Sequence, residues 1–154
     1  RLLFLQLGLA TMAQNANTPT LELARREVER WFDEQHIDRS ALVLDNGSGL
    51  SRSERISALG LGRLLQVAYA SPLMPELMAS LPITGVDGTL RRAKSRATGS
   101  AHLKTGSLND VVAMAGYVHG ALGKRYVLVA MVNHPNAKAA RPAIDAMGEW
   151  AARQ

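Results

Sequence analysis

The 154-residue sequence contains no cysteine. This absence excludes disulfide bonds, thiolate catalysis and cysteine-based metal sites, and it leaves the redox compartment undetermined. Histidine is also scarce, and none of the four stands three or four residues from another; they are His36, His102, His119 and His134. Because no helical pair of histidine ligands is available, the sequence predicts no metal site, and no motif indicates a cofactor.

The sequence also lacks an apolar run of the roughly 20 residues that cross a bilayer. Its longest such run, residues 2–10, is interrupted by Gln6. One interpretation of this run is a signal-peptide core, because Arg1 precedes it and small residues follow it. We favour a buried helix, since Leu2, Leu5 and Leu9 recur at helical spacing.

Charged residues make up 20% of the chain and hydrophobic residues 47%, which is the balance of a globular domain. The net charge of +5 permits an anionic partner. However, the only tight basic cluster, residues 91–96, contains no aromatic residue on which a base could stack. The sequence therefore predicts a solvated loop there and no nucleic-acid binding.

Three patterns predict helices in an N-terminal helical segment, residues 1–80; they cover residues 19–35, 58–70 and 74–80. Thr18 and Pro19 have the residue types of an N-cap and a first helical position. Ser57 is the expected cap of the second helix. A short apolar run at 41–44, followed by turn-forming residues, predicts a strand.

Three strand patterns follow in a predicted meander over about 101–133; they cover residues 101–107, 111–119 and 125–133. Their short connections require antiparallel neighbours. The last segment, 137–152, has Ile144, Met147 and Trp150, with Ala151, on one face and is expected to be a helix packed on the sheet. The predicted fold class is α/β of the α+β type, with an antiparallel sheet covered by helices.

A lysine, a threonine and a glycine stand together in the first predicted strand. Alternation turns Lys104 and Gly106 to one face of the sheet and Thr105 to the other. One interpretation is structural: an edge-strand charge, with the glycine at a bulge. The other is functional: Lys104 and Thr105 hold a substrate carboxylate, Gly106 leaves room for the ligand, and the Ser107 N–H meets an oxyanion.

Three ordered segments favour the functional interpretation; they are NGSGLSR at 46–52, LPITGVDGTL at 81–90 and HLKTGSL at 102–108. They resemble the D-alanyl-D-alanine carboxypeptidase/endopeptidase family of class C low-molecular-mass penicillin-binding proteins, over about residues 1–150. The resemblance implies a β-lactamase/transpeptidase-like fold. It also implies a periplasmic serine hydrolase that acts on peptidoglycan stem peptides through an acyl-serine intermediate and binds β-lactams.

The family's nucleophile lies in an S-x-x-K motif, and none of the four lysines here has a serine three residues before it. Ser107-Leu108-Asn109 matches the family's S-x-N motif, but it adjoins K-T-G on the same strand, so we do not assign it that role. Because the chain starts at Arg1 in an apolar element, we expect residues 1–154 to be the C-terminal part of the penicillin-binding domain. We expect this part to be inactive alone.

Two alternatives stay open. Arg52 either meets an anionic group of the stem peptide or belongs to a turn that only packs the domain. The whole chain is either part of the enzyme or a non-catalytic cell-wall-binding or structural module that kept the fold. No pattern in the sequence indicates an oligomeric state.

Overall fold

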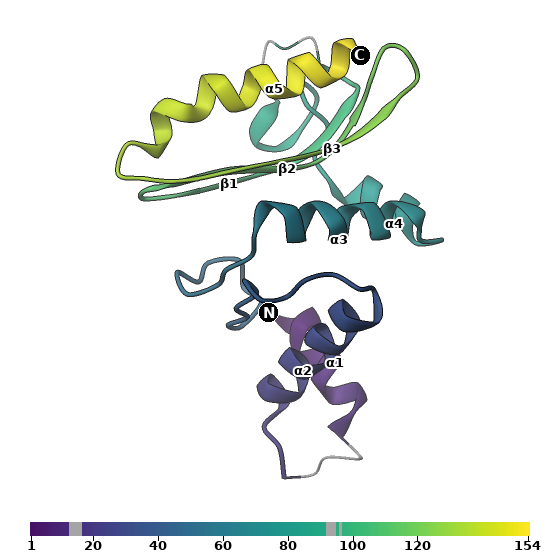
Figure 1. Ribbon diagram of the computed structural model, residues 1–154, viewed down its shortest axis with the longest axis vertical. Helices are drawn as coiled ribbons and strands as arrows, with labels where there is room; N and C mark the ends of the chain where they lie inside the picture. Colours follow the sequence, from purple (N-terminus) through teal and green to yellow (C-terminus); the bar gives the residue numbers. More distant parts are fainter. Residues whose placement is uncertain (13–16, 92–94, 96) are drawn as a thin grey trace. The chain divides into compact units, whose positions relative to one another are not determined.

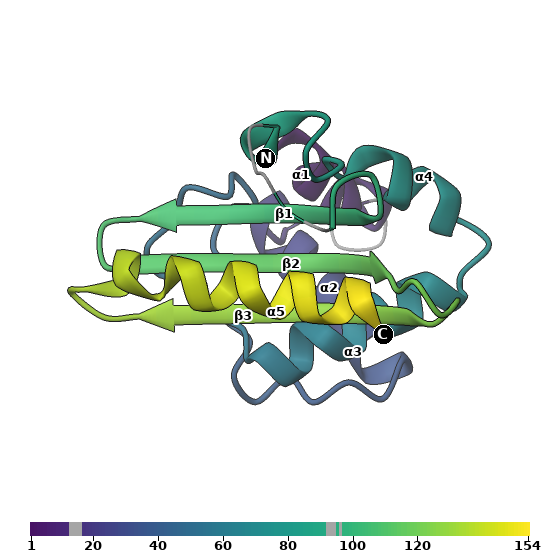
Figure 2. The ribbon, with the colours of Figure 1, turned by 90° about the horizontal axis from the view of Figure 1, so that it is seen from above.

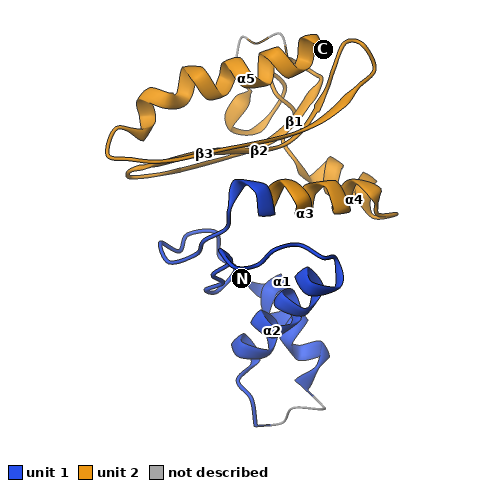
Figure 3. Cartoon of the chain, viewed as in Figure 1, with its two compact units in different colours: residues 1–60 blue, residues 61–154 orange. Residues whose placement is uncertain are grey.

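The computed structural model describes residues 1–12, 17–91, 95 and 97–154. The chain divides into two compact units, residues 1–60 and 61–154 (Figure 3). Within the predicted basic cluster, Arg92, Lys94 and Arg96 lie outside the described residues. Among the helices that are described, none is long and apolar enough to cross a membrane.

The first unit is built on a pair of helices, α1 (Leu2–Ala10) and α2 (Thr20–Glu34). They touch at Gly8, where a Cβ atom would lie 2.2 Å from the Thr20 carbonyl oxygen. Because α1 spans Leu2–Ala10, the helix predicted from the apolar run is confirmed. Its predicted burial is wrong, because Leu2 and Leu3 are 80% and 86% exposed and Gly8 is the buried residue of α1.

Two local predictions in this unit fail. The N-cap of α2 is Pro19, in extended conformation, and no side chain caps the helix, so the predicted Thr18 cap is wrong. The predicted strand at 41–44 is reduced to one bridge, between Val43 and Arg55. A short apolar run forms a strand only where a partner strand continues the ladder of hydrogen bonds, and one isolated bridge is not such a ladder.

The second unit contains a three-stranded antiparallel sheet in the order β1-β2-β3 (Figure 2). Its strands are β1 (Ala101–Leu108), β2 (Val111–His119) and β3 (Arg125–Asn133), which confirms the predicted meander. The turn between β1 and β2 holds Asp110 at φ +66°, a conformation that Asp and Asn tolerate better than most residues. The two-residue connection fixes the register, in which Lys104 pairs with Ala115.

Helix α5 (Arg141–Arg153), preceded by the short helix η3 (Ala137–Ala140), covers one face of the sheet (Figures 1 and 2). The core between them is apolar; it includes Leu103, Val112, Met114, Val118, Leu128, Ile144 and Ala151. The predicted face of this helix is partly wrong, since Met147 and Trp150 are 45% and 54% exposed. Ile144 and Ala151 are buried as predicted, together with Gly148 and Ala152, because small side chains let the helix backbone approach the sheet.

The other face of the sheet meets the part of α3 (Ala58–Ala70) that belongs to the second unit (Figure 1). Tyr117 on β2 is 2% exposed, and its hydroxyl donates a hydrogen bond of 2.7 Å to the Leu65 carbonyl. Burial raises the pKa of Tyr117, with a smaller contribution from Tyr69.

The predicted Ser57 cap of α3 is confirmed by the bond of 2.9 Å from the Gly60 N–H to the Ser57 hydroxyl. The short helix α4 (Met74–Ser80) follows as predicted.

Replacing Tyr117 by Phe should lower the free energy of unfolding by about 0.5–1.5 kcal/mol, because the variant loses one buried hydrogen bond and keeps the ring. Urea unfolding of the two proteins measures the difference. Tyr69→Phe is the matched control: its ring packs 5.5 Å from that of Tyr117, and its hydroxyl makes no hydrogen bond with the described residues. An equal loss in both variants would contradict the role of the Leu65 bond.

Candidate functional site

β1 is an edge strand, and only part of its outer edge is covered. The Leu103 N–H donates to the Pro82 carbonyl at 3.0 Å, and the Thr84 N–H donates to the Ala101 carbonyl at 2.8 Å. Because alternate residues of a strand direct their backbone groups to the same edge, Thr105 and Ser107 face this outer side too. No described residue accepts a hydrogen bond from the Ser107 N–H. The outer edge of β1 is therefore closed at 101–103 and open at 105–107.

The Lys104 ammonium reaches this open edge. Its Nζ atom donates to the Thr105 carbonyl at 2.8 Å, and that carbonyl lies on the outer edge. The Lys104 and Thr105 side chains project from opposite faces of the sheet, as predicted. Their partners in the register, Ala115 and Met114, are successive residues of β2 and alternate in the same way. The long lysine side chain nevertheless places its charge beside the edge that carries the Ser107 N–H.

Gly106 lies in a continuous ladder opposite Ala113, so no bulge is present and the structural interpretation of this glycine is wrong. A Cβ atom at position 106 would meet only the Ala113 Cβ, at 3.5 Å, which is ordinary van der Waals contact. Gly116 differs: its φ is +148°, and a Cβ there would lie 2.1 Å from the His102 carbonyl oxygen. The described residues thus require glycine at 116 and leave space for a side chain at 106.

Gly106→Ala should change the free energy of unfolding by less than about 0.5 kcal/mol, because the new methyl group meets no clash. Gly116→Ala should lower it by at least about 2 kcal/mol, because strand pairing must distort to admit the methyl group. Thermal and urea unfolding of both variants against the parent protein measure the contrast. If both variants lose similar stability, the fold itself needs glycine at 106.

One residue that the sequence did not single out lies against this site. The Thr89 hydroxyl is 2.6 Å from the Thr105 hydroxyl. Thr89 belongs to the short helix η2 (Gly88–Leu90), inside the segment 81–90 that carries the family resemblance. In the same segment the Asp87 carboxylate accepts a bond of 2.6 Å from the Ile83 N–H, so Asp87 helps to hold the shape of this loop.

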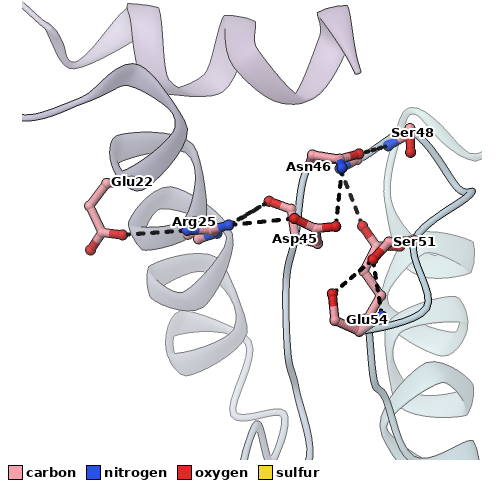
Figure 4. Close-up of polar contacts among 9 residues, drawn as sticks. Glu22, Arg25, Asp45, Asn46, Ser48, Ser51 and Glu54 are labelled. Atoms are coloured by element: carbon pink, nitrogen blue, oxygen red, sulfur yellow. Dashed lines mark hydrogen bonds and ion pairs between the residues drawn. The ribbon is translucent and has the colours of Figure 1, made fainter.

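The loop that carries Arg52 is held by its own polar groups and by α2 (Figure 4). Arg25 of α2 donates to the Asp45 carbonyl at 2.9 Å. Backbone N–H groups of the loop donate to its side chains: Ser48 to Asn46 at 3.0 Å, Gly47 to Glu54 at 3.2 Å and Leu50 to Ser48 at 3.2 Å. These bonds give the loop a defined shape without a strand or helix.

The serines of this loop serve its backbone. The Ser51 hydroxyl accepts from the Ser53 N–H at 3.1 Å, a bond typical of serine in turns. The Arg52 side chain is exposed, and its guanidinium makes no hydrogen bond or ion pair with the described residues. Lys104, Thr105, Gly106 and Ser107 lie together in the second unit, whereas Arg52 belongs to the first. Its part in the same site therefore stays a prediction.

Two histidines stack on the sheet face from which Lys104 projects. The rings of His102 and His119 lie 5.6 Å apart, and both rings carry a buried nitrogen, His102 Nδ1 and His119 Nε2, without a partner among the described residues. Burial lowers the pKa of His119, and the positive charge of Arg125 and the proximity of His102 lower it further. The folded protein therefore favours neutral His119.

This shift predicts a pH-dependent stability. Because the pKa of His119 is lower in the folded state, the unfolded chain binds the proton more tightly, so the free energy of unfolding should fall as the pH drops from about 7.5 to about 5.5. Above this window both states hold neutral histidine and the contribution is constant. Urea unfolding across the window tests this, and His119→Gln should flatten the slope while His36→Asn, at an exposed position, should not. An unchanged slope in His119→Gln would contradict it.

The model of the D-Ala-D-Ala carboxypeptidase 3 (S13) family matches residues 5–154. The chain belongs to this family. Among curated relatives, the D-alanyl-D-alanine carboxypeptidase of Actinomadura sp. (strain R39) is 35% identical over 118 residues, which cover 72% of this chain and 22% of that protein. The D-alanyl-D-alanine carboxypeptidase DacB of Haemophilus influenzae is 28% identical over 118 residues, or 74% and 25% of the two chains. The S13 chain thus spans about a quarter of the length of these relatives.

Solved structures share the fold. Penicillin binding protein 4 (dacB) from Haemophilus influenzae, complexed with a β-lactam, superposes with a TM-score of 0.74 at 22% identity, over 96% of this chain and 37% of that one. A second structure of the same protein gives 0.68 at 24% identity, over 83% and 32%. These likenesses confirm the predicted transpeptidase-like α+β fold, and the family assignment confirms the resemblance first seen in residues 46–52, 81–90 and 102–108.

Proposed function

We propose that this chain forms one wall of the active site of a serine-type D-Ala-D-Ala carboxypeptidase or endopeptidase that acts on peptidoglycan stem peptides in the periplasm. Membership of the S13 family supports the reaction class. The observation that carries the proposal is the open edge of β1, where the Lys104 ammonium and a free Ser107 N–H flank a glycine that the fold does not need. In this proposal the 154 residues are the C-terminal part of the penicillin-binding domain.

The substrate of such an enzyme ends in a D-Ala carboxylate. The Lys104 ammonium and the Thr105 hydroxyl are donors that suit this anion, and a charge-assisted bond from lysine contributes most. Nζ donates to the Thr105 carbonyl, which keeps the charge at the open edge. The ligand carboxylate then replaces that neutral carbonyl as the acceptor. Gly106 lets the ligand backbone approach the strand.

The outward Ser107 N–H has a separate role in the proposal. When a serine hydroxyl attacks the scissile carbonyl, negative charge develops on its oxygen, and a backbone N–H aimed at that oxygen stabilises the tetrahedral intermediate. Collapse of the intermediate expels D-Ala and leaves an acyl-serine, which water hydrolyses. Lys104 assists proton movement in these steps. A β-lactam acylates the same serine, and a β-lactam complex of a protein with this fold supports that ligand class.

The attacking serine and its lysine base come, in this proposal, from an S-x-x-K segment outside the 154 residues. The Arg52 side chain is exposed, and its guanidinium suits an anionic group of the stem peptide. The donors assigned here are all side chains or backbone groups of the chain itself. The chemistry proposed needs no cofactor and no nucleic acid.

Lys104→Ala should lower kcat/KM for a peptide ending in D-Ala-D-Ala, because one charge-assisted contact to the carboxylate is lost. The fall should correspond to a loss of about 1.5–3 kcal/mol of transition-state stabilisation. The kinetics are measured on a protein that contains this chain together with the S-x-x-K segment. Lys124→Ala is the matched control, since Lys124 is an exposed lysine on the β2–β3 connection. Unchanged kinetics in Lys104→Ala would remove Lys104 from the site.

Labelled penicillin separates the enzyme from a non-catalytic wall-binding module of the same fold. The protein with its S-x-x-K segment should gain the mass of the acyl group, and the 154-residue chain alone should not. If the longer protein also stays unacylated, the enzyme proposal fails and the binding-module alternative stands. Acylation of the chain alone would show that the nucleophile lies within it.

A further inference from the structure

Among the described residues, Thr89 makes the one hydrogen bond to the Thr105 hydroxyl. The two Oγ1 atoms are 2.6 Å apart, although the residues are 16 positions apart in the sequence. Either hydroxyl can be the donor in this pair. Since a hydroxyl has one hydrogen and two lone pairs, the direction of the Thr89 bond decides what Thr105 can offer to a ligand.

The position of Thr89 is set by a loop that is tied both to itself and to β1. The Gly85 N–H donates to the Leu90 carbonyl at 3.0 Å, and the Asp87 carboxylate accepts from the Ile83 N–H at 2.6 Å. The loop is anchored on the outer edge of β1 through Pro82 and Thr84. Gly88 has φ +56°, and a Cβ there would lie 2.7 Å from the Pro82 Cβ. Thr89 therefore meets Thr105 from a closed loop that leaves little freedom of placement.

A carboxylate can only accept hydrogen bonds. If Thr105 donates to Thr89, its own hydrogen is used, and its lone pairs face an incoming carboxylate. If Thr89 donates to Thr105 instead, the Thr105 hydrogen is free to point to the ligand. The second arrangement also polarises the Thr105 hydroxyl and strengthens its donation, because hydrogen bonds in a chain reinforce one another.

We propose that Thr89 is a positioning residue, which donates to Thr105 so that the Thr105 hydroxyl donates to the terminal carboxylate of the substrate. The inference rests on the proposed function and adds a determinant of specificity to it. The pair favours ligands that end in a free carboxylate over ligands that end in an amide. An amide offers both an acceptor and a donor, so it tolerates either direction of the Thr89 bond.

The test compares two peptides, one ending in D-Ala-D-Ala and one ending in its C-terminal amide, with the protein that contains the S-x-x-K segment. Thr89→Val should raise KM for the acid by about threefold to tenfold, with kcat little changed, because the contact to the carboxylate exists in the bound substrate and in the transition state alike. The amide should be affected less than twofold. Thr89→Ser should restore the parent values. In a Thr105→Val background, Thr89→Val should have no further effect.

Thr84→Val is the matched control. It removes a hydroxyl from the same loop, and that hydroxyl is buried without a partner among the described residues, so KM for the acid should not rise. Equal losses for acid and amide in Thr89→Val, or no loss for either, would overturn the positioning role. If the parent protein cleaves neither peptide and is not acylated by labelled penicillin, the proposed function fails and takes this inference with it.

Discussion

Hydrogen bonding along the two edges of β1 is the constraint on which the proposed site depends. The inner edge is paired with β2 along the whole strand, from Ala101 opposite Val118 to Leu108 opposite Val111. The outer edge is bonded to the loop at 82–84 and then left open. An unpaired edge is normally a liability, because its N–H and C=O groups can pair with another chain. In this chain the open stretch carries the K-T-G residues, and a charged lysine stands beside it.

The layers of the second unit hold that edge in place. Apolar residues of β1 and β2 pack against α5, and the close approach of this helix depends on Gly148 and on two alanines. On the opposite face, the Tyr117 hydroxyl binds the Leu65 carbonyl and joins the sheet to α3. β1 cannot slip by one residue against β2, since a slip would turn the buried side chains of Ala101 and Leu103 to the opposite face of the sheet. The register in turn fixes which backbone groups of 105–107 point outward.

Local patterns predicted most elements of this fold and failed where a distant partner decided the outcome. The three strands and the Ser57 cap were predictable, because alternation and capping act over a few residues. The run at 41–44 has the composition of a strand but finds only one bridge. Hydrophobicity predicts Met147 and Trp150 on the buried face of α5, yet both are exposed. Gly148 and Ala152 are buried beside Ile144 and Ala151, because small side chains allow close packing of the helix on the sheet.

The sequence by itself determined the family, the residue types of the proposed site and the strand that bears them, since K-T-G and its two companion segments are linear patterns. Only the tertiary structure decided that Gly106 has room for a side chain, that the Lys104 charge returns to the outer edge, and that Thr89 meets Thr105. The physical reason is that these facts depend on a loop docked by backbone hydrogen bonds. Such bonds are available to nearly every residue, so no local pattern of side chains encodes them.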